Sequence, residues 1–142
     1  MKILLDSSVF ISFLNDADIL HNKTTALFRT LLQDKEVIVI TPVLVFLEVA
    51  HILHKQINDF DEASVLTIFE KYEKIDLTFS LALEIIPFLK KINLKTSDAI
   101  FIAVAKLTKA TLITWDKKLE KEAKKFIDVQ TPKTFLSKGK EN

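Results

Sequence analysis

The sequence predicts an α/β fold, in which a parallel sheet carries helices on both faces. Short apolar segments alternate with longer amphipathic segments along the whole chain, which is the pattern of a parallel sheet with helical connections. The first short segment is apolar at successive positions, which is typical of a strand buried on both sides. A length of 142 residues with 49% hydrophobic residues suits one domain with a sizeable core.

Five segments are predicted as strands, at residues 2–5, 36–41, 75–77, 111–114 and 126–129. The first ends at an acid after its apolar run, so we expect that acid at the edge of the sheet. The second is rich in β-branched residues, which favour pleated structure. The other three are shorter and continue the alternation of strands with helices.

Helices are predicted at residues 9–14, 21–33, 42–56, 59–74, 80–91 and 98–108, followed by a lysine-rich helix and a short final turn at Pro132. Their expected N-terminal caps include Ser7 or Ser8, Asp59 or Asp61, and Thr96 or Ser97. Pro42 suits the first turn of its helix, because that turn needs no backbone N–H from it. Pro87 is expected to kink or split the helix that contains it.

The basic residues are unevenly distributed, although the net charge is only +1. Nearly all of them are lysines, which crowd residues 117–125 and recur at residues 133–140. This pattern is typical either of a solvated helix with a basic tail or of a rim that attracts phosphate. We expect a single domain over residues 1–142, of which about 133–142 form a short basic tail.

The composition excludes several kinds of site. The chain has no cysteine, which excludes disulfides and thiolate metal sites. Its single glycine, Gly139, lies near the end, so glycine-rich phosphate-binding loops are absent. No apolar run approaches the roughly 20 residues that cross a membrane, and the start is too short for a signal peptide. We therefore expect a cytoplasmic protein with no membrane partner.

Four acidic residues lie at predicted strand ends or on apolar faces of predicted helices. Asp6 and Asp116 follow the first and fourth predicted strands, and ligands of open α/β sheets bind at the carboxyl ends of strands. Glu48 and Asp98 lie among apolar residues of predicted helices. Burying a lone carboxylate is costly unless it is paired or binds a metal.

Electrostatics links these acids to a cation. Two carboxylates about 4 Å apart repel by about 4 kcal/mol at an effective dielectric constant of about 20, so four together need a neutralising cation or raised pKa values. Oxygen ligands favour Mg²⁺, with Mn²⁺ as the alternative. Taken singly, each acid has a simpler interpretation: Asp98 as a first-turn acid, Asp6 and Asp116 as turn residues, and Glu48 as the partner of a lysine.

Four short motifs give the sequence a family resemblance. Residues 6–11, DSSVFI, resemble the opening motif of PIN-domain ribonucleases. Glu48 in its apolar helix, residues 98–100, DAI, and residues 114–116, TWD, resemble the other three motifs of that family. The four motifs, in this order, cover nearly the whole chain. The chain is also similar in length to the VapC-like toxins of toxin–antitoxin pairs.

The resemblance implies a three-layer α/β/α fold with a five-stranded parallel sheet in the order 3-2-1-4-5. It also implies an acidic quartet that binds Mg²⁺ and hydrolyses RNA phosphodiester bonds as an endonuclease. The quartet would be the four acids named above, Asp6, Glu48, Asp98 and Asp116. Ser8 and Thr114 would support it through hydrogen bonds to a carboxylate or to water on the cation.

The sequence departs from the family pattern in two places. Trp115 stands where a small polar residue, often Asn, is common, and the glycine that usually precedes the third motif is missing from residues 92–97. These departures bear on the choice of substrate more than on metal binding.

The expected partners follow from the same resemblance. They are an RNA substrate, a cognate antitoxin protein and a second copy of the chain in a homodimer. Lys95, Lys117 and Lys118 are candidate contacts to the RNA backbone, although exposed lysines are commonly just solvated.

Other functions remain to be compared with this one. Two alternatives keep the same fold. One is an RNA-binding or scaffold protein without catalysis, and the other is an RNA-processing nuclease without an antitoxin. A receiver domain needs adjacent acids after its first strand, and a haloacid-dehalogenase-type phosphatase needs Asp-x-Asp, but Asp6 is followed by two serines. Glu48 and His51 have the Glu-x-x-His spacing of di-iron bundles, but the partner motif is absent.

Overall fold

A computed structural model of the chain describes residues 1–140. Its centre is one five-stranded sheet in the order β3-β2-β1-β4-β5, and every neighbouring pair is parallel. The strands are β1 (Lys2–Leu5), β2 (Ile38–Pro42), β3 (Glu73–Ile75), β4 (Thr111–Ile113) and β5 (Val129–Gln130). The predicted α/β class and strand order are confirmed.

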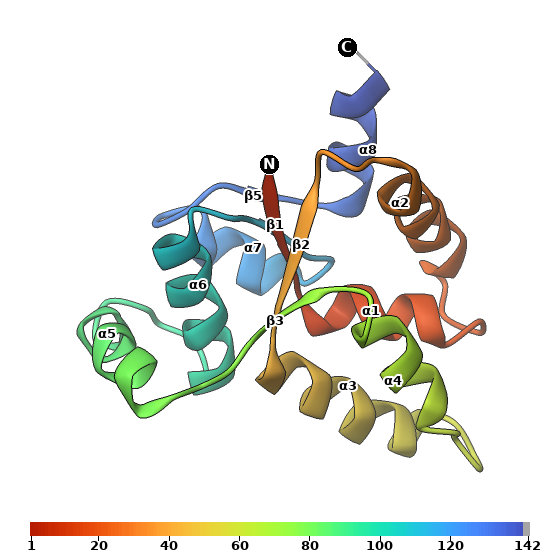
Figure 1. Cartoon of the computed structure of the whole chain (residues 1–142), viewed down its shortest axis with the longest axis horizontal. Helices are drawn as coiled ribbons and strands as arrows, with labels where there is room; N and C mark the ends of the chain where they lie inside the picture. The colour runs from red at the N-terminus through yellow and green to blue at the C-terminus, as the bar shows by residue number, and fades with distance from the viewer. Residues whose placement is uncertain (141–142) are drawn as a thin grey trace.

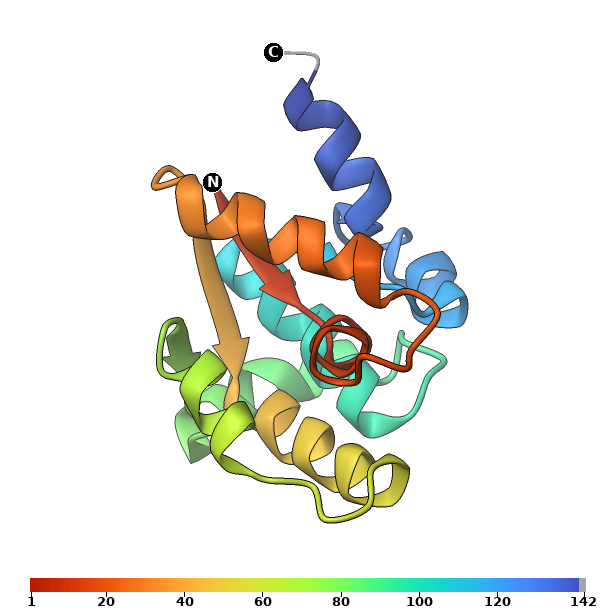
Figure 2. The same ribbon diagram turned by 90° about the vertical axis from the view of Figure 1, so that its right-hand side faces the viewer.

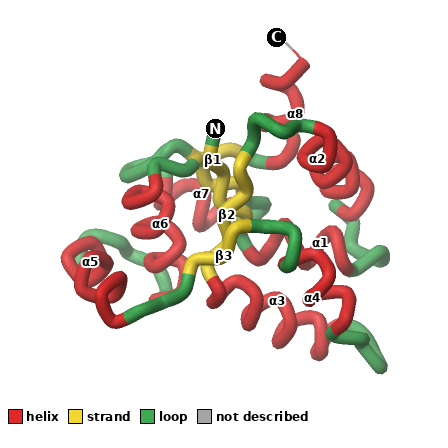
Figure 3. Tube along the Cα trace, viewed as in Figure 1, coloured by secondary structure: helices red, strands yellow, loops and turns green. Residues whose placement is uncertain are grey.

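Helices surround this sheet, as Figure 3 shows by colour. They are α1 (Ser7–Leu14), α2 (His21–Gln33), α3 (Val43–Gln56), α4 (Ala63–Phe69), α5 (Phe79–Leu89), α6 (Thr96–Thr108), α7 (Lys117–Ala123) and α8 (Pro132–Lys140). In Figure 1, α5 and α6 lie to the left of the sheet, and α1, α2 and α4 lie to its right. The sheet is thus the middle of three layers.

The central strand β1 is fully buried at Ile3, Leu4 and Leu5, as expected for a strand covered on both faces. It pairs with β2 on one side and with β4 on the other. The backbone N–H of Asp6 donates to the carbonyl of Ile113 at 3.0 Å, so the chain leaves β1 and β4 at the same level. The residues that follow these two strands therefore meet at one edge of the sheet.

The first helix begins earlier than predicted, and its cap is different. Asp6, not Ser7 or Ser8, is the N-cap of α1, because its backbone is extended and its carboxylate accepts from the N–H of Ser8. In α5, Pro87 lies within the helix but only two residues before its end, so α5 is not split.

The chain between α3 and β3 also differs from the prediction. Helix α4 is seven residues long instead of covering residues 59–74. Asp59 has a left-handed backbone with φ 53°, which a helix cannot contain, and Asp61 accepts from the N–H of Ala63 at the helix start. Strand β3 occupies residues 73–75 instead of 75–77, because an edge strand can carry exposed polar residues such as Glu73.

The end of the chain has a shorter strand and a longer helix than predicted. Residues 126–129 were predicted as the last strand, but β5 starts only at Val129, where the main chain reaches β4. The predicted turn at Pro132 is the start of the nine-residue helix α8, which packs against α2 (Figure 2). Helix α8 thus takes up most of the segment predicted as a basic tail, whose residues 141–142 lie outside the described part.

Left-handed backbone occurs at Lys109 as well, with φ 57°, where it ends α6. The N–H of Ala110 then donates to the carbonyl of Ala105 at 2.9 Å, which closes the helix end. This position commonly holds glycine, because a Cβ crowds the following carbonyl there. Among the described residues, no helix is long and apolar enough to cross a membrane.

Candidate metal centre

Asp6 is held rigidly at the carboxyl edge of the sheet. Its side chain is buried, with 3% of the residue exposed, and Oδ2 accepts from the hydroxyls of Ser8 at 2.7 Å and Thr114 at 2.8 Å. Each hydroxyl oxygen in turn accepts a backbone N–H, from Trp115 at 3.1 Å and Asp116 at 3.0 Å. Since a hydroxyl has one proton, both protons are committed to Asp6. Segments from α1 and β4 thus fix one carboxylate oxygen.

Asp98 lies in the first turn of α6 and is 8% exposed. Burial raises the pKa of its carboxyl to about 6, and the positive charge of Lys95 opposes this effect. The remaining causes of the raised pKa are the charges of the other three acids, Asp6, Asp116 and Glu48. The fold therefore brings the other three predicted acids within electrostatic reach of Asp98.

Glu48 reaches the same region from α3. Burial raises the pKa of its carboxyl, the charge of Lys95 lowers it, Asp6 raises it, and a 3.4 Å hydrogen bond from Ser97 lowers it. The Lys95 ammonium lies 3.9 Å from Oε2. The other oxygen, Oε1, is buried and has no hydrogen-bond partner in the described part of the chain. An orphaned carboxylate oxygen beside other acids suits a cation ligand.

Asp116 differs from the other three because it is exposed at the rim. Its Oδ1 caps α7 by accepting the N–H groups of Lys118 at 2.9 Å and Leu119 at 3.1 Å. Within residues 1–140, no three His, Cys, Asp or Glu side chains stand close enough together to form a ready metal-binding group. Ligation by three of the acids therefore requires side-chain rotation.

The predicted lysines lie around these acids. Lys95 precedes α6 and contacts Glu48, and Lys117 and Lys118 are exposed in the first turn of α7. The lysines and the acids share one edge of the sheet. His51 is exposed on α3, which favours a surface role over an iron ligand.

Three hydrogen bonds in and around the site, made by Ser97 and Trp115, were not predicted. Thr96 or Ser97 was expected to cap α6, but the N-cap is Lys95, which makes no side-chain cap bond, and the Ser97 hydroxyl donates to Glu48. Trp115 donates its backbone N–H to Ser8 and its indole N–H to Thr24. In the sequence, the only sign that Trp115 belongs to the site is its position between Thr114 and Asp116. Its contact with Thr24 could not be predicted, because the helix that carries Thr24 is remote in sequence.

Solved structures with the same fold include toxins of toxin–antitoxin pairs. Mycobacterium tuberculosis VapC20, described as a sarcin–ricin loop cleaving toxin, has a TM-score of 0.72 and 19% identity over 90% of this chain and 98% of that one. Rickettsia felis VapBC2, bound to a DNA fragment from its promoter, has a TM-score of 0.69 and 16% identity over 92% and 98%. A Klebsiella pneumoniae toxin–antitoxin complex has a TM-score of 0.68 and 19% identity over 92% and 97%.

Sequence comparison gives the family. No curated protein matched the sequence. The profile of the PIN domain matches residues 3–125, a span that includes all four acidic motifs and strands β2, β3 and β4. Because this match covers most of the 142 residues, the chain belongs to the PIN domain family.

Proposed function

We propose that this protein is a Mg²⁺-dependent endoribonuclease of the cytoplasm and the toxin of a VapBC-type pair. The observation that carries the proposal is the orphaned, buried Oε1 of Glu48 beside the buried acids Asp6 and Asp98. Carboxylates in this setting favour a cation, because each one disfavours the charge of the others.

Asp6, Glu48 and Asp98 would hold the ion, Mg²⁺ or Mn²⁺, with Asp116 at the rim. When bound, the ion would activate water for attack on a phosphodiester and neutralise charge on the leaving oxygen. Ser8 and Thr114 keep the Asp6 carboxylate in one orientation. One of the four carboxylates would also accept a proton from the attacking water.

An RNA substrate is supported by the charges around this edge. Lys95, Lys117 and Lys118 present exposed ammonium groups beside the acids, where they can contact successive phosphates of an RNA strand. The acids then face the scissile phosphate, and the lysines hold its neighbours.

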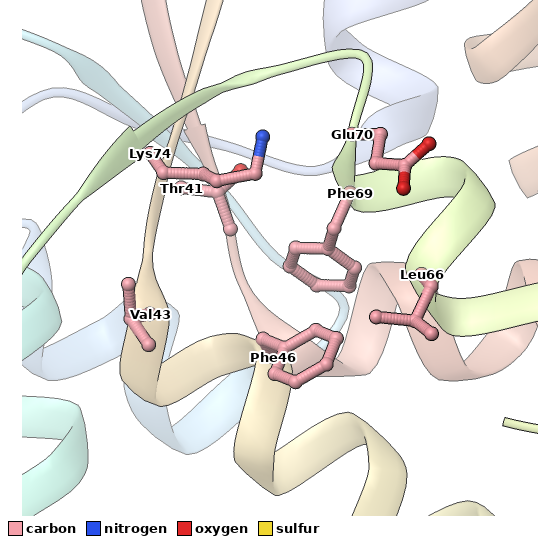
Figure 4. Close-up of a pocket in the computed structure, with 7 residues that line it drawn as sticks. All are labelled: Thr41, Val43, Phe46, Leu66, Phe69, Glu70 and Lys74. Atoms are coloured by element: carbon pink, nitrogen blue, oxygen red, sulfur yellow. The ribbon is translucent and has the colours of Figure 1, made fainter. Parts of the chain in front are cut away.

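An antitoxin partner is supported by an apolar hollow between α3 and α4. Its volume is about 230 Å³. Figure 4 shows the residues that line it, which are Thr41, Val43, Phe46, Leu66, Phe69, Glu70 and Lys74. Leu66 is exposed in the single chain. We propose that an apolar segment of the antitoxin covers this surface. One solved structure with the same fold, from Klebsiella pneumoniae, is a toxin–antitoxin complex.

The gene beside this one tests the partner. We expect it to encode a small protein with a DNA-binding domain and a tail, which copurifies with the wild-type chain. Leu66→Glu should weaken that complex. A neighbouring gene of unrelated type would favour an RNA-processing nuclease that has no antitoxin.

A homodimer is supported by the outer face of α5. Phe79 is 80% exposed, and Leu83 and Ile86 follow it on the same side of the helix. We propose that a second copy covers this stripe. Leu83→Glu should convert a dimer into a monomer in light scattering, and a wild-type monomer would contradict the proposal.

A metal titration tests the central proposal. Mg²⁺ or Mn²⁺ should raise the melting temperature of the wild-type chain, since a ligand at about 100 times its Kd stabilises the native state by about 2.7 kcal/mol. RNA cleavage should require the ion and stop with chelator. Asp6→Asn should abolish both responses, while Asp34→Asn, an exposed acid near the opposite edge, should keep both. A metal-independent melting temperature and no cleavage would favour an RNA-binding scaffold.

A further inference from the structure

Trp115 is the only tryptophan of the chain and stands between two residues of the candidate centre. Its backbone N–H donates to the Ser8 hydroxyl at 3.1 Å. Its indole Nε1–H donates to the Thr24 hydroxyl at 2.9 Å. One residue thus joins the end of β4 to α1 through Ser8 and to α2 through Thr24.

The acceptor of the indole belongs to a buried polar pair. Thr24 is 0% exposed and Ser12 is 2% exposed, and their hydroxyl oxygens lie 2.7 Å apart across the α1–α2 interface. Thr24 also donates to the carbonyl of Leu20 at 2.9 Å, so its oxygen is free to accept the indole proton. Such a satisfied buried network holds its members in one arrangement.

We propose that Trp115 is a positioning residue of the acid cluster, anchored by its indole on Thr24. The anchor holds the backbone N–H of residue 115 on Ser8, which in turn keeps the Ser8 proton on Asp6 Oδ2. Because Ser8 and Thr114 both bind that one oxygen, a cation would approach Oδ1 of Asp6, which accepts only a longer hydrogen bond from the Ser7 hydroxyl at 3.4 Å. The inference rests on the proposed function and adds α2 to the parts of the fold that set the centre.

A positioning role and a packing role predict different results. If Trp115 only filled space, removing the indole hydrogen bond would lower the free energy of unfolding and leave the native centre as it was. If it positions Asp6, the same change weakens metal binding in protein that is still folded. Groups that orient metal ligands typically contribute about 10–100-fold to metal affinity.

Thr24→Val tests this, because valine keeps the shape of threonine and removes the acceptor. Thr25→Val is the matched control: Thr25 also donates to a carbonyl one turn back, at 2.9 Å, whereas the indole of Trp115 donates to Thr24 and not to Thr25. Mn²⁺ affinity is measured by calorimetry on folded protein, and cleavage of one RNA is measured for kcat and KM.

We expect Thr24→Val to bind Mn²⁺ about tenfold more weakly, with a lower kcat and an unchanged KM for RNA, since the lysines are untouched. Thr24→Ser should restore the wild-type values, and Thr25→Val should retain them. Should Thr24→Val fail to fold, Trp115→Phe replaces it, because phenylalanine is a smaller aromatic side chain that has no indole N–H to donate.

The outcomes separate this inference from the proposed function. Wild-type Mn²⁺ affinity and kcat in folded Thr24→Val and Trp115→Phe would overturn the positioning role alone. A wild-type chain that neither binds Mn²⁺ nor cleaves RNA would overturn the proposed function, and the inference with it. Equal weakening in Thr24→Val and Thr25→Val would assign the effect to α2 as a whole and overturn the role of Trp115.

Discussion

At the scale of single residues, the protonation of the Asp98 carboxyl affects the free energy of unfolding. Its pKa of about 6 lies above the ordinary value of 3.8, mainly because the carboxyl is buried. Between these two pH values the native chain therefore holds more protons than the unfolded chain. The free energy of unfolding thus falls as pH rises from about 3.8 to about 6, and the loss is complete above that range.

Asp98→Asn removes this loss, because an amide does not ionise. Without metal at pH 7, we expect the variant to be more stable than the wild type by on the order of 1–3 kcal/mol. Urea unfolding with chelator at pH 4 and pH 7 measures the difference, which should be small at pH 4. If the stability difference between Asp98→Asn and the wild type were no larger at pH 7 than at pH 4, burial would not be the cause of the raised pKa.

The same carboxyl makes cation binding dependent on pH. A proton on Asp98 competes with the ion, so Mg²⁺ affinity should fall as pH drops through about 6. Calorimetric titrations at pH 5 and pH 7 measure this, with proton release on binding visible in buffers of different ionisation heat. Equal affinity at both pH values would exclude Asp98 as a ligand.

The sequence predicted which acids to consider, but not their immediate partners. Asp6 and Asp116 follow strands, and Glu48 interrupts an apolar helix face, so their types and positions were informative. The hydrogen bond from Trp115 to Thr24 spans 91 residues, and nothing in either local pattern indicates it. Such hydrogen bonds depend on how two helices pack, which one sequence does not specify.

At the scale of elements, Asp116 has a second role as the N-cap of α7. Asp116→Asn keeps a good cap and removes the charge, whereas Asp116→Ala removes both. We expect both variants to lose cleavage, but only alanine to lower the free energy of unfolding, by about 1 kcal/mol. Unimpaired cleavage by Asp116→Asn would restrict Asp116 to capping.

The elements that the sequence predicted well are those with buried faces. Strand β1 and helices α2 and α3 have strong apolar patterns, and their ends were found to within a residue. The edge strands β3 and β5 were misplaced, because β3 carries Glu73 and Lys74 and β5 ends in Gln130. At an edge, main-chain pairing decides the strand, and side-chain polarity carries little information about it.

At the scale of the whole molecule, the net charge of +1 does not describe where the lysines lie, because different lysines lie at the two edges of the sheet. Lys117 and Lys118 lie beside the acids at the carboxyl edge, while Lys2 and Lys35 lie near the amino edge. RNA affinity should therefore depend on which lysines are neutralised, even when the net charge changes equally.

The double variant Lys117→Gln/Lys118→Gln should bind single-stranded RNA more weakly. Its salt dependence should be shallower by about 0.7 in slope for each phosphate that a lysine no longer neutralises. Lys2→Gln/Lys35→Gln carries the same net charge and should bind like the wild type. Fluorescence anisotropy at several salt concentrations, with chelator to prevent cleavage, measures both. Equal weakening in the two variants would indicate a nonspecific charge effect.

The left-handed turn at Lys109 is a position where a substitution can raise the stability of the protein without changing the candidate metal centre. Glycine tolerates that geometry, so Lys109→Gly should gain about 0.5–1 kcal/mol after allowing for the looser unfolded chain. Lys106→Gly, in the last turn of the same helix, should lose at least about 1 kcal/mol, because it also removes the hydrogen bond from Lys106 Nζ to the carbonyl of Phe126. Urea midpoints that shift in opposite directions in the two variants would show that the left-handed backbone at Lys109 costs the protein stability that a glycine there recovers.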